Sequence, residues 1–225
     1  MKKYLPLLLL FISMAFLLCC KGNKVKENIG RMRVINASYL SGGINIDMDY
    51  GTVYNTYVEY LNYSLFRDYI ATKHKLQIRN ISGAIFIDTA ITIVENKDYT
   101  LFVYDSAGYI LHKVIEENFI TPVGSTCNVR FLHLSNNVNR VDVLDTANTL
   151  FFHSMKNGEY SPYTSFNSGT YKFIVNQAGT SNLIYASPPT TFQPGYFYTM
   201  YLKGNTGSVG IDSVGLFEVG LNGDY

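Results

Sequence analysis

The sequence predicts an all-β protein made of two tandem immunoglobulin-like β-sandwich domains that follow an N-terminal signal segment. Three observations support this prediction. The chain is rich in aromatic residues, with 19 Tyr and 14 Phe, and in β-branched residues, which favour strands. Short strand-like segments alternate with turn residues along its length. The pattern of these segments also occurs twice.

Strand-like segments are clearest where apolar and polar residues alternate. In 74–80, Leu76 and Ile78 alternate with Lys75, Gln77 and Arg79, which predicts one buried and one exposed face. We expect further strands at 31–38, 44–49, 99–105, 128–135, 140–145, 171–176 and 196–203. Segment 58–70 comes nearest to a helical pattern and predicts a loop with a helical turn. Many short strands at this spacing are typical of a sandwich.

The repeat is visible as four matches in the same order. "RVINAS" (33–38) aligns with "RFLHLS" (130–135) at an offset of 97 residues. The same offset relates "YSLFRDY" to "YSPYTSF" and "HKLQI" to "YKFIV", and an offset of 99 relates "YTLFVYDSAG" to "YTMYLKGNTG". A two-residue shift aligns "NIDMD" with "RVDVLD" and makes Asp47 equivalent to Asp142. A unit of about 95 residues suits a seven-stranded immunoglobulin-type sandwich.

The N-terminus predicts export and lipid anchoring. A positive start is followed by an apolar run from Leu5 to Leu18, which is too short to span a bilayer as a helix. The run ends at "LLCC", which resembles the lipobox of bacterial lipoproteins, with Leu17 at −3 and Cys20 as the lipidated cysteine. The resemblance implies that residues 1–19 are a removed signal peptide and that Cys20 carries fatty-acyl chains such as palmitate. Two or more such chains anchor a protein stably in a membrane.

These features give a domain plan. Residues 20–30 are predicted to form a flexible tether, 31–120 the first sandwich repeat and 124–225 the second. The junction lies near 116–126, which contains Pro122 and Gly124.

Charge and cysteine content exclude some function classes. Five of the 18 Lys and Arg lie within residues 1–26, which leaves 13 against 17 acidic residues and a net charge of about −4 in the folded part. Nucleic-acid binding is not expected, because it draws its affinity from a basic patch. Beyond the lipobox the only cysteine is Cys127, so no internal disulfide is expected and a structural thiol is predicted.

Several motifs resemble an uncharacterised bacterial family, the domain of unknown function 4397. Its repeats begin with a strand of the form V-R-x-x-x-A/S and continue with V-D-V, a G-x-Y strand and a G-x-x-Y-T strand. The second repeat matches this order with "VRFLHLS", "VDV", "SGTYKFIV" and "QPGYFYT". The first has "RVINAS", "NIDM" and "KDYT". The resemblance covers about residues 31–219, implies a secreted or lipid-anchored protein, and brings no catalytic residues.

No catalytic or metal-binding motif is present. The sequence has no G-x-S-x-G elbow, no phosphate-binding glycine loop and no His or Cys pair at zinc-ligand spacing. We therefore expect no enzyme activity, no cofactor and no metal. The alternative is a hydrolase whose site is assembled from distant residues, for example Asp47 with Asp142.

Four triplets of the form Asp-Ser/Thr-aliphatic occur, where composition predicts roughly 0.6. They resemble the acceptor that one group of Gram-negative bacteria uses for periplasmic O-glycosylation. The acceptors would be Thr89, Ser106, Thr146 and Ser213, with Ser106 and Thr146 favoured as exposed turns after strands. The alternative is that Asp-Ser/Thr pairs simply stabilise turns through side-chain hydrogen bonds.

Together these patterns predict a lipid-anchored cell-envelope protein that acts as a non-enzymatic binding or structural module. Its partners would be the membrane, through the lipid, and an envelope protein or glycan. Glycan binding through exposed tyrosines is the alternative within the binding class. The residues after Cys20 are Lys21, Gly22, Asn23 and Lys24, without an acidic surface-export cluster. We therefore expect an outer-membrane protein that faces the periplasm, with the cell surface as the alternative.

Overall fold

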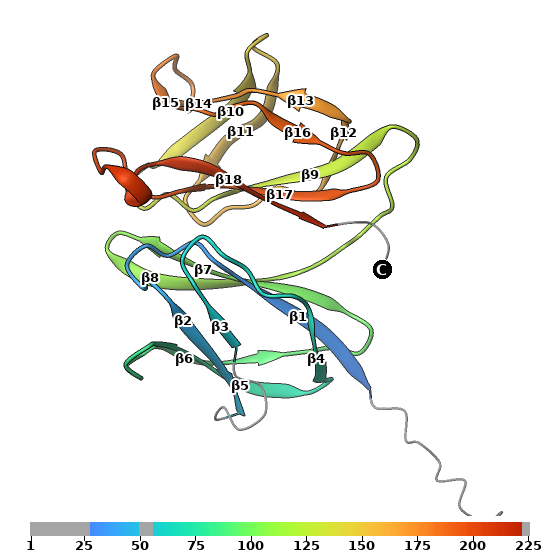
Figure 1. Ribbon diagram of the computed structural model, residues 1–225, viewed down its shortest axis with the longest axis vertical. Helices are drawn as coiled ribbons and strands as arrows, with labels where there is room; N and C mark the ends of the chain where they lie inside the picture. Colours follow the sequence, from blue (N-terminus) through green and yellow to red (C-terminus); the bar gives the residue numbers. More distant parts are fainter. Residues whose placement is uncertain (1–27, 50–55, 222–225) are drawn as a thin grey trace, which may run out of the picture.

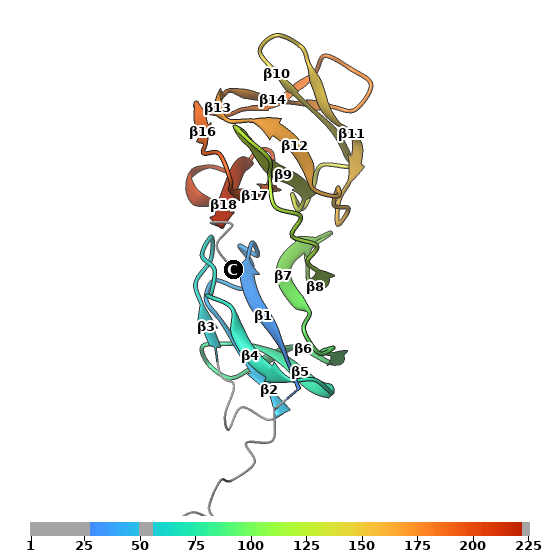
Figure 2. The ribbon, with the colours of Figure 1, turned by 90° about the vertical axis from the view of Figure 1, so that its right-hand side faces the viewer.

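The computed structural model describes residues 28–49 and 56–221, and this part of the chain is all-β. It contains no α-helix, and its one complete helical element is a single 3-10 turn, Gly210–Asp212. Figures 1 and 2 show two sandwiches stacked along the long axis of the molecule, the first in blue to green and the second in yellow to red. The predicted fold class is thereby confirmed. The predicted signal peptide, Cys20 and most of the tether lie outside the described residues.

The first sandwich is made of two four-stranded sheets. The sheet nearer the second sandwich has the order β4-β1-β7-β8, from Arg67–Ile70, Ile29–Asn36, Asp98–Ser106 and Tyr109–Glu116. The outer sheet has the order β3-β2-β5-β6, from Thr56–Val58, Ile44–Met48, Lys73–Asn80 and Ile85–Thr92. β1 begins at Ile29, inside the predicted tether, and pairs in parallel with β7.

The second sandwich repeats this plan. Its inner sheet has the order β12-β9-β17-β18, from Thr164–Asn167, Thr126–His133, Phe197–Lys203 and Gly215–Leu221. Its outer sheet has the order β11-β10-β14-β15, from Leu150–Lys156, Arg140–Asp145, Phe173–Gln177 and Leu183–Ala186. A small sheet pairs β13, Gly169–Tyr171, with β16, Thr190–Phe192. β9 is parallel to β17, as β1 is to β7.

Strand pairing confirms the repeat but corrects one alignment. Ile46 pairs with Ile78 and Val143 with Val175, and both members of the second pair lie 97 residues after those of the first. This register makes Leu144, not Asp142, the equivalent of Asp47. The two-residue shift was therefore wrong, because the offset of 97 holds through the outer sheet. Only the sequence similarity of the two acidic segments had favoured the shift.

The segment expected to hold a helical turn instead supplies an extra edge strand. After β3 ends at Val58, the chain makes a turn, bridges to β1 at Tyr63 and enters β4. The equivalent segment forms β12 beside β9. The described part of the first repeat consequently has eight strands rather than the seven expected for the unit.

Each sandwich has its own core, and a third apolar cluster joins them. The first core is mainly aliphatic, with Ile44, Ile46 and Leu76 fully buried. The second is built largely of aromatic rings: Phe131, Phe152, Phe166, Phe173 and Phe192. The third cluster takes residues from both repeats: Ile35, Ala37, Phe102, Tyr104, Ile115, Leu132, Leu134, Tyr201 and Val219. The inner sheets are therefore covered on both faces, which explains the long buried runs in β1, β7, β9 and β17.

Candidate functional site at the domain junction

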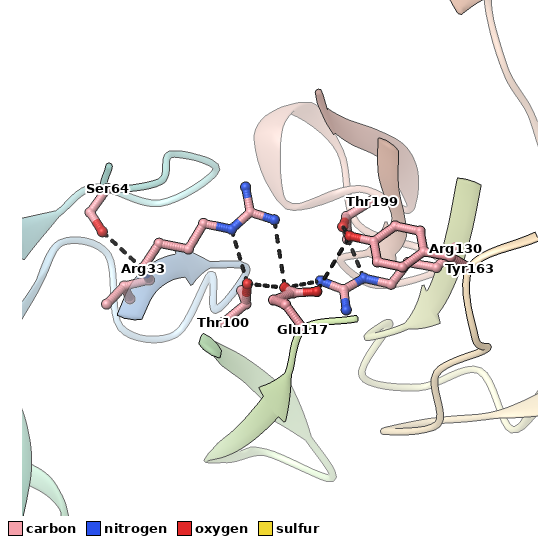
Figure 3. A network of polar contacts seen from close by, with 8 residues as sticks. Arg33, Ser64, Thr100, Glu117, Arg130, Tyr163 and Thr199 are labelled. Carbon is pink, nitrogen blue, oxygen red and sulfur yellow. Dashed lines mark hydrogen bonds and ion pairs between the residues drawn. The ribbon is translucent and has the colours of Figure 1, made fainter. Parts of the chain in front are cut away.

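Two buried arginines face each other across the junction of the sandwiches. Arg33 on β1 and Arg130 on β9 are equivalent residues, and each is at most 2% exposed. Alternation along each strand directs the neighbours Met32 and Phe131 into their own cores, whereas the arginines lie on the face that meets the other repeat. Arg33 Nε donates to Thr100 Oγ1 at 2.9 Å, and Arg130 Nε donates to Thr199 Oγ1 at the same distance (Figure 3).

Glu117 lies between the two arginines. It directly follows β8, and its Oε1 is 2.6 Å from Arg130 Nη2 and 3.8 Å from Arg33 Nη2. Thr100 Oγ1 donates to the same oxygen, and the Tyr163 hydroxyl is 3.4 Å from the other one (Figure 3). A buried charge must be paired and hydrogen-bonded to be tolerated. This network therefore ties the start of the linker to both sandwiches.

Aromatic rings stabilise the same guanidinium groups. Arg33 lies over the Phe66 ring at 5.2 Å, and Arg130 lies over the Tyr163 ring at 4.8 Å. Phe66 and Tyr163 are again equivalent residues, 97 positions apart. Cation–π contacts of this kind gain strength when they are desolvated. Each repeat thus supplies an Arg–Thr pair and an aromatic ring, whereas the carboxylate comes from the linker alone.

Polar contacts also join the repeats beyond this network. Lys113 Nζ donates to the Gly158 carbonyl at 2.8 Å, and Gly108 N donates to Asn136 Oδ1 at 3.1 Å. The Tyr60 hydroxyl donates to the Ile211 carbonyl at 3.3 Å. Together with the third apolar cluster, these contacts fix how the two sandwiches are oriented.

A cleft of about 510 Å³ opens beside the network, where the linker passes between the sandwiches. Both repeats and the linker line it, through Ile115, Glu116, Asn118, Ile120, Asn128, Arg130, Tyr160, Ser161, Pro162, Tyr163 and Ser165. The volume falls in the range of small-ligand sites, which are often found at domain junctions. We define this space as the junction cleft.

The equivalent place in the first repeat has different chemistry. There Arg31 forms a two-point ion pair with Asp98, with distances of 2.7 and 2.6 Å. In the second repeat Asn128 and Phe197 occupy these paired positions. Asn128 lines the junction cleft, so an amide stands there in place of the Arg31 guanidinium.

The predicted acceptor residues differ in accessibility. Thr146 is exposed in the turn after β10, as expected. Ser106 is half-buried and is the last residue of β7, so the expectation that it lies in an exposed turn is wrong. Thr89 pairs with buried Leu76 on the inward-facing side of β6. Ser213 is half-buried, and its hydroxyl donates to the Gly210 carbonyl at 2.7 Å.

The aspartates of these triplets have structural partners. Asp145 Oδ1 accepts hydrogen bonds from the backbone N–H groups of Ala147 and Thr149, both at 2.8 Å. This is the turn-stabilising role that competes with the modification hypothesis. Asp105 is buried and accepts from the Ser38 hydroxyl at 2.6 Å.

The structure does not bring Asp47 and Asp142 together. Asp47 lies on β2 and is paired with Arg79 Nε at 2.8 Å, whereas Asp142 lies on β10 in the outer sheet of the other sandwich (Figure 1). Burial alone would raise the pKa of Asp142, but hydrogen bonds from the N–H groups of Gly179 and Ser154 outweigh it and lower the pKa. Both carboxylates therefore hold loops and strands in place.

Other residues considered for chemistry are also structural. Cys127 is fully buried, and burial raises the pKa of its thiol to about 11, which keeps it protonated. Within residues 28–49 and 56–221, no three His, Cys, Asp or Glu side chains cluster as metal ligands would. In the same ranges no helix has the length and apolar character needed to cross a bilayer.

The sequence prediction did not identify Glu117, Arg33, Arg130 or the cleft. A signal for the arginines was present, because they occupy the same place in two apolar strands of the repeat. A charged residue kept at such a position indicates a buried partner. Glu117 follows β8 and lies outside the strand segments that repeat in the sequence. Its role depends on the path of the linker, which the sequence pattern does not predict.

Comparisons with known proteins identify a family. The model for the domain of unknown function DUF4397 matches residues 30–144 and 127–215. None of the curated proteins matches the chain. A leucine-rich repeat protein from Bacteroides thetaiotaomicron VPI-5482 is similar to 80% of this chain and 26% of its own, at 10% identity and a TM-score of 0.21. The Bacillus anthracis TIE protein is similar to 78% of this chain and 34% of its own, at 10% identity and a TM-score of 0.25.

This chain thus spans about a third or less of the length of both solved structures. The two matches to the family model, by contrast, run through both sandwiches and the linker between them. They cover more than half of the sequence, and the protein belongs to the DUF4397 family.

Proposed function

We propose that this protein is a lipid-anchored binding module of the bacterial cell envelope that carries out no catalysis. The observation that supports a binding role is the junction cleft, which both repeats and the linker build together. Small-molecule sites are concave, largely pre-formed and frequent at domain junctions. The cleft meets these three criteria.

The charged groups around the cleft favour a binding role over a catalytic one. Arg130 is hydrogen-bonded to Glu117 at 2.6 Å, and both side chains are buried. Glu116 is ion-paired with Lys97 at 2.6 Å. A general acid or base needs a proton that it can exchange with a substrate, and these carboxylates are engaged with cations.

Anchoring through Cys20 and an outer-membrane location are the other parts of the proposal. The lipobox resemblance supports the anchor, and the lack of an acidic cluster after Cys20 supports a periplasm-facing orientation. Because β1 begins at Ile29, only eight residues separate it from Cys20. The first sandwich would therefore lie near the membrane surface.

Metabolic labelling with a fatty-acid analogue tests the anchor. Wild type and Cys19→Ser should be labelled and sediment with the outer membrane, whereas Cys20→Ser should be unlabelled and absent from the outer membrane. Labelling of Cys20→Ser with loss on Cys19→Ser would refute the assignment. Protease added to intact cells should leave the protein whole, and its degradation would place it on the cell surface.

A further inference from the structure

We propose that the junction cleft binds an uncharged carbohydrate chain, with Tyr160 as the aromatic platform. This inference rests on the proposed binding function and names its ligand class. It is carried by four features of the cleft: its aromatic lining, its free polar groups, its charged groups that already have protein partners, and its fixed shape.

The aromatic platform is Tyr160. Its side chain remains 44% exposed although the residue bridges to Leu132 of β9. Lys113 Nζ lies 5.2 Å from the centre of the ring, so a cation–π contact holds the ring in position. Tyrosine combines an apolar ring with a polar tip, which suits the alternating C–H and O–H surface of a sugar.

Polar groups on the rim remain available to a ligand. Asn118 and Ser165 line the cleft and are exposed, and neither side chain has a hydrogen-bond partner among the described residues. An amide and a hydroxyl both donate and accept hydrogen bonds. Sugar hydroxyls do the same, so the two sets of groups match.

The charged groups at the cleft are engaged within the protein, so a ligand need not supply a counter-charge. Arg130 and Arg33 share Glu117 at the base of the cleft, and Glu116 is paired with Lys97. Lys113 Nζ donates to the Gly158 carbonyl, so each of these charged groups already has a partner in the protein. The folded part of the chain carries a net charge of about −4, which would repel polyanions. A neutral polyhydroxylated chain needs no counter-charge from the protein and meets no such repulsion.

The shape of the cleft is fixed before any ligand binds. Glu117 ties one end of the linker to both sandwiches, and Asn128 Nδ2 donates to the Ile120 carbonyl at 2.6 Å three residues later. A pre-formed site pays less conformational entropy on binding.

The first repeat provides a matched control. Tyr63 is the equivalent of Tyr160, is likewise 44% exposed, and bridges to Ile35 as Tyr160 bridges to Leu132. In the first repeat the Arg31–Asp98 ion pair stands where the second repeat has Asn128 and Phe197. Comparing the variant that lacks the Tyr160 ring with the variant that lacks the Tyr63 ring therefore distinguishes loss of the site from loss of any exposed tyrosine.

Isothermal titration calorimetry and saturation-transfer NMR test the proposal on the full lipidated protein in detergent micelles. The probes are neutral hexasaccharides of α-1,4-glucose, β-1,4-glucose, β-1,3-glucose and α-mannose, together with neutral oligosaccharides released from the envelope of the native host. An alginate hexasaccharide and an unstructured neutral peptide are the comparison probes.

We expect at least one neutral saccharide to bind. Tyr160→Ala should weaken binding by at least about tenfold, as loss of a central aromatic contact does, whereas Tyr63→Ala should leave it within about twofold. Asn118→Ala should weaken binding by about fivefold, which corresponds to one hydrogen bond. Equal melting temperatures would show that all three variants fold.

Three outcomes would overturn the inference. They are failure of every neutral saccharide to bind, binding that Tyr63→Ala and Tyr160→Ala weaken equally, and a preference for alginate or the peptide. If the saccharides fail while Cys20 is labelled, the ligand class is wrong and the envelope anchor stands. If Cys20 is unlabelled while saccharides bind, the lipid anchor is wrong and the ligand class stands.

Discussion

Arg33 and Arg130 approach the same carboxylate oxygen of Glu117 from opposite sandwiches, at 3.8 and 2.6 Å. They are equivalent residues of the two repeats, so equivalent faces of the two sandwiches meet around one acid. Such an arrangement resembles the interface of a homodimer. In this chain the linker both joins the halves and supplies the counter-charge.

The first prediction concerns the removal of this acid. Glu117→Gln leaves two buried guanidinium groups without their carboxylate, and loss of one partner from a buried pair costs about 3–5 kcal/mol. Urea unfolding of the full chain should show a loss of this size.

Its neighbour provides the control. Glu116 is 49% exposed and pairs with an equally exposed Lys97, so Glu116→Gln should cost less than about 1 kcal/mol. Equal effects of the two substitutions would mean that Glu117 does not hold the junction.

The second prediction concerns acid stability and His133. This histidine is fully buried, and burial lowers its pKa to about 4. Its Nδ1 accepts a hydrogen bond from Ser135 N at 3.3 Å, which requires the neutral ring. The unfolded state takes up its proton near pH 6.5 and the folded state only near pH 4, so stability should fall between these values by roughly 3 kcal/mol.

His133→Asn is the matched variant, because Asn36 occupies the equivalent position in the first repeat. There the Asn36 side chain accepts from Ser38 N at 3.1 Å and donates to the Gly42 carbonyl at 2.8 Å. The variant should lose much of the slope in unfolding free energy between pH 6.5 and 4. An unchanged slope would assign the acid sensitivity to other groups, such as His112, whose pKa burial also lowers.

Strand positions and the repeat were accessible from the sequence because they depend on local alternation. Leu76 and Ile78 are fully buried, as the pattern predicted. β4 was missed because "FRDYI" carries only one buried residue, Tyr69, so it shows no alternating pattern. Its pairing with β1 depends on tertiary contacts that the local sequence does not reveal. The junction was missed for a similar reason. Burial of Ile35 and Phe102 on the second face of their strands depends on the other repeat.

The third prediction concerns the separated repeats. Each has a complete core, so fragments 27–120 and 124–225 should both give β-type circular dichroism. Each also exposes its half of the third apolar cluster, and the second fragment has lost Glu117. The fragments should therefore associate one-to-one when mixed, and the mixture should melt at a higher temperature than either fragment alone.

Light scattering after size-exclusion chromatography checks the association. Glu117→Gln in the first fragment should weaken it, whereas Glu116→Gln should not. Two fragments that remain monomeric when mixed would show that the junction has little affinity of its own and depends on the covalent linker.

The last prediction concerns O-glycosylation. Thr146 is exposed in a turn, whereas Thr89 faces inward and Ser106 and Ser213 are half-buried. If the Asp-Ser/Thr-aliphatic triplets are acceptors, Thr146 should carry the glycan, because an enzyme must reach its hydroxyl in the folded chain. Intact-mass measurement of protein from the native host should show one glycan, which Thr146→Ala removes and Thr89→Ala retains.

Asp145→Asn separates modification from turn formation. Asn can accept the same two backbone hydrogen bonds as Asp145 and so preserves the turn, but it removes the acidic residue of the triplet. The variant should therefore fold normally and lose the glycan. A wild-type mass equal to peptide plus lipid would refute the modification and leave the Asp145 hydrogen bonds as the reason for that triplet.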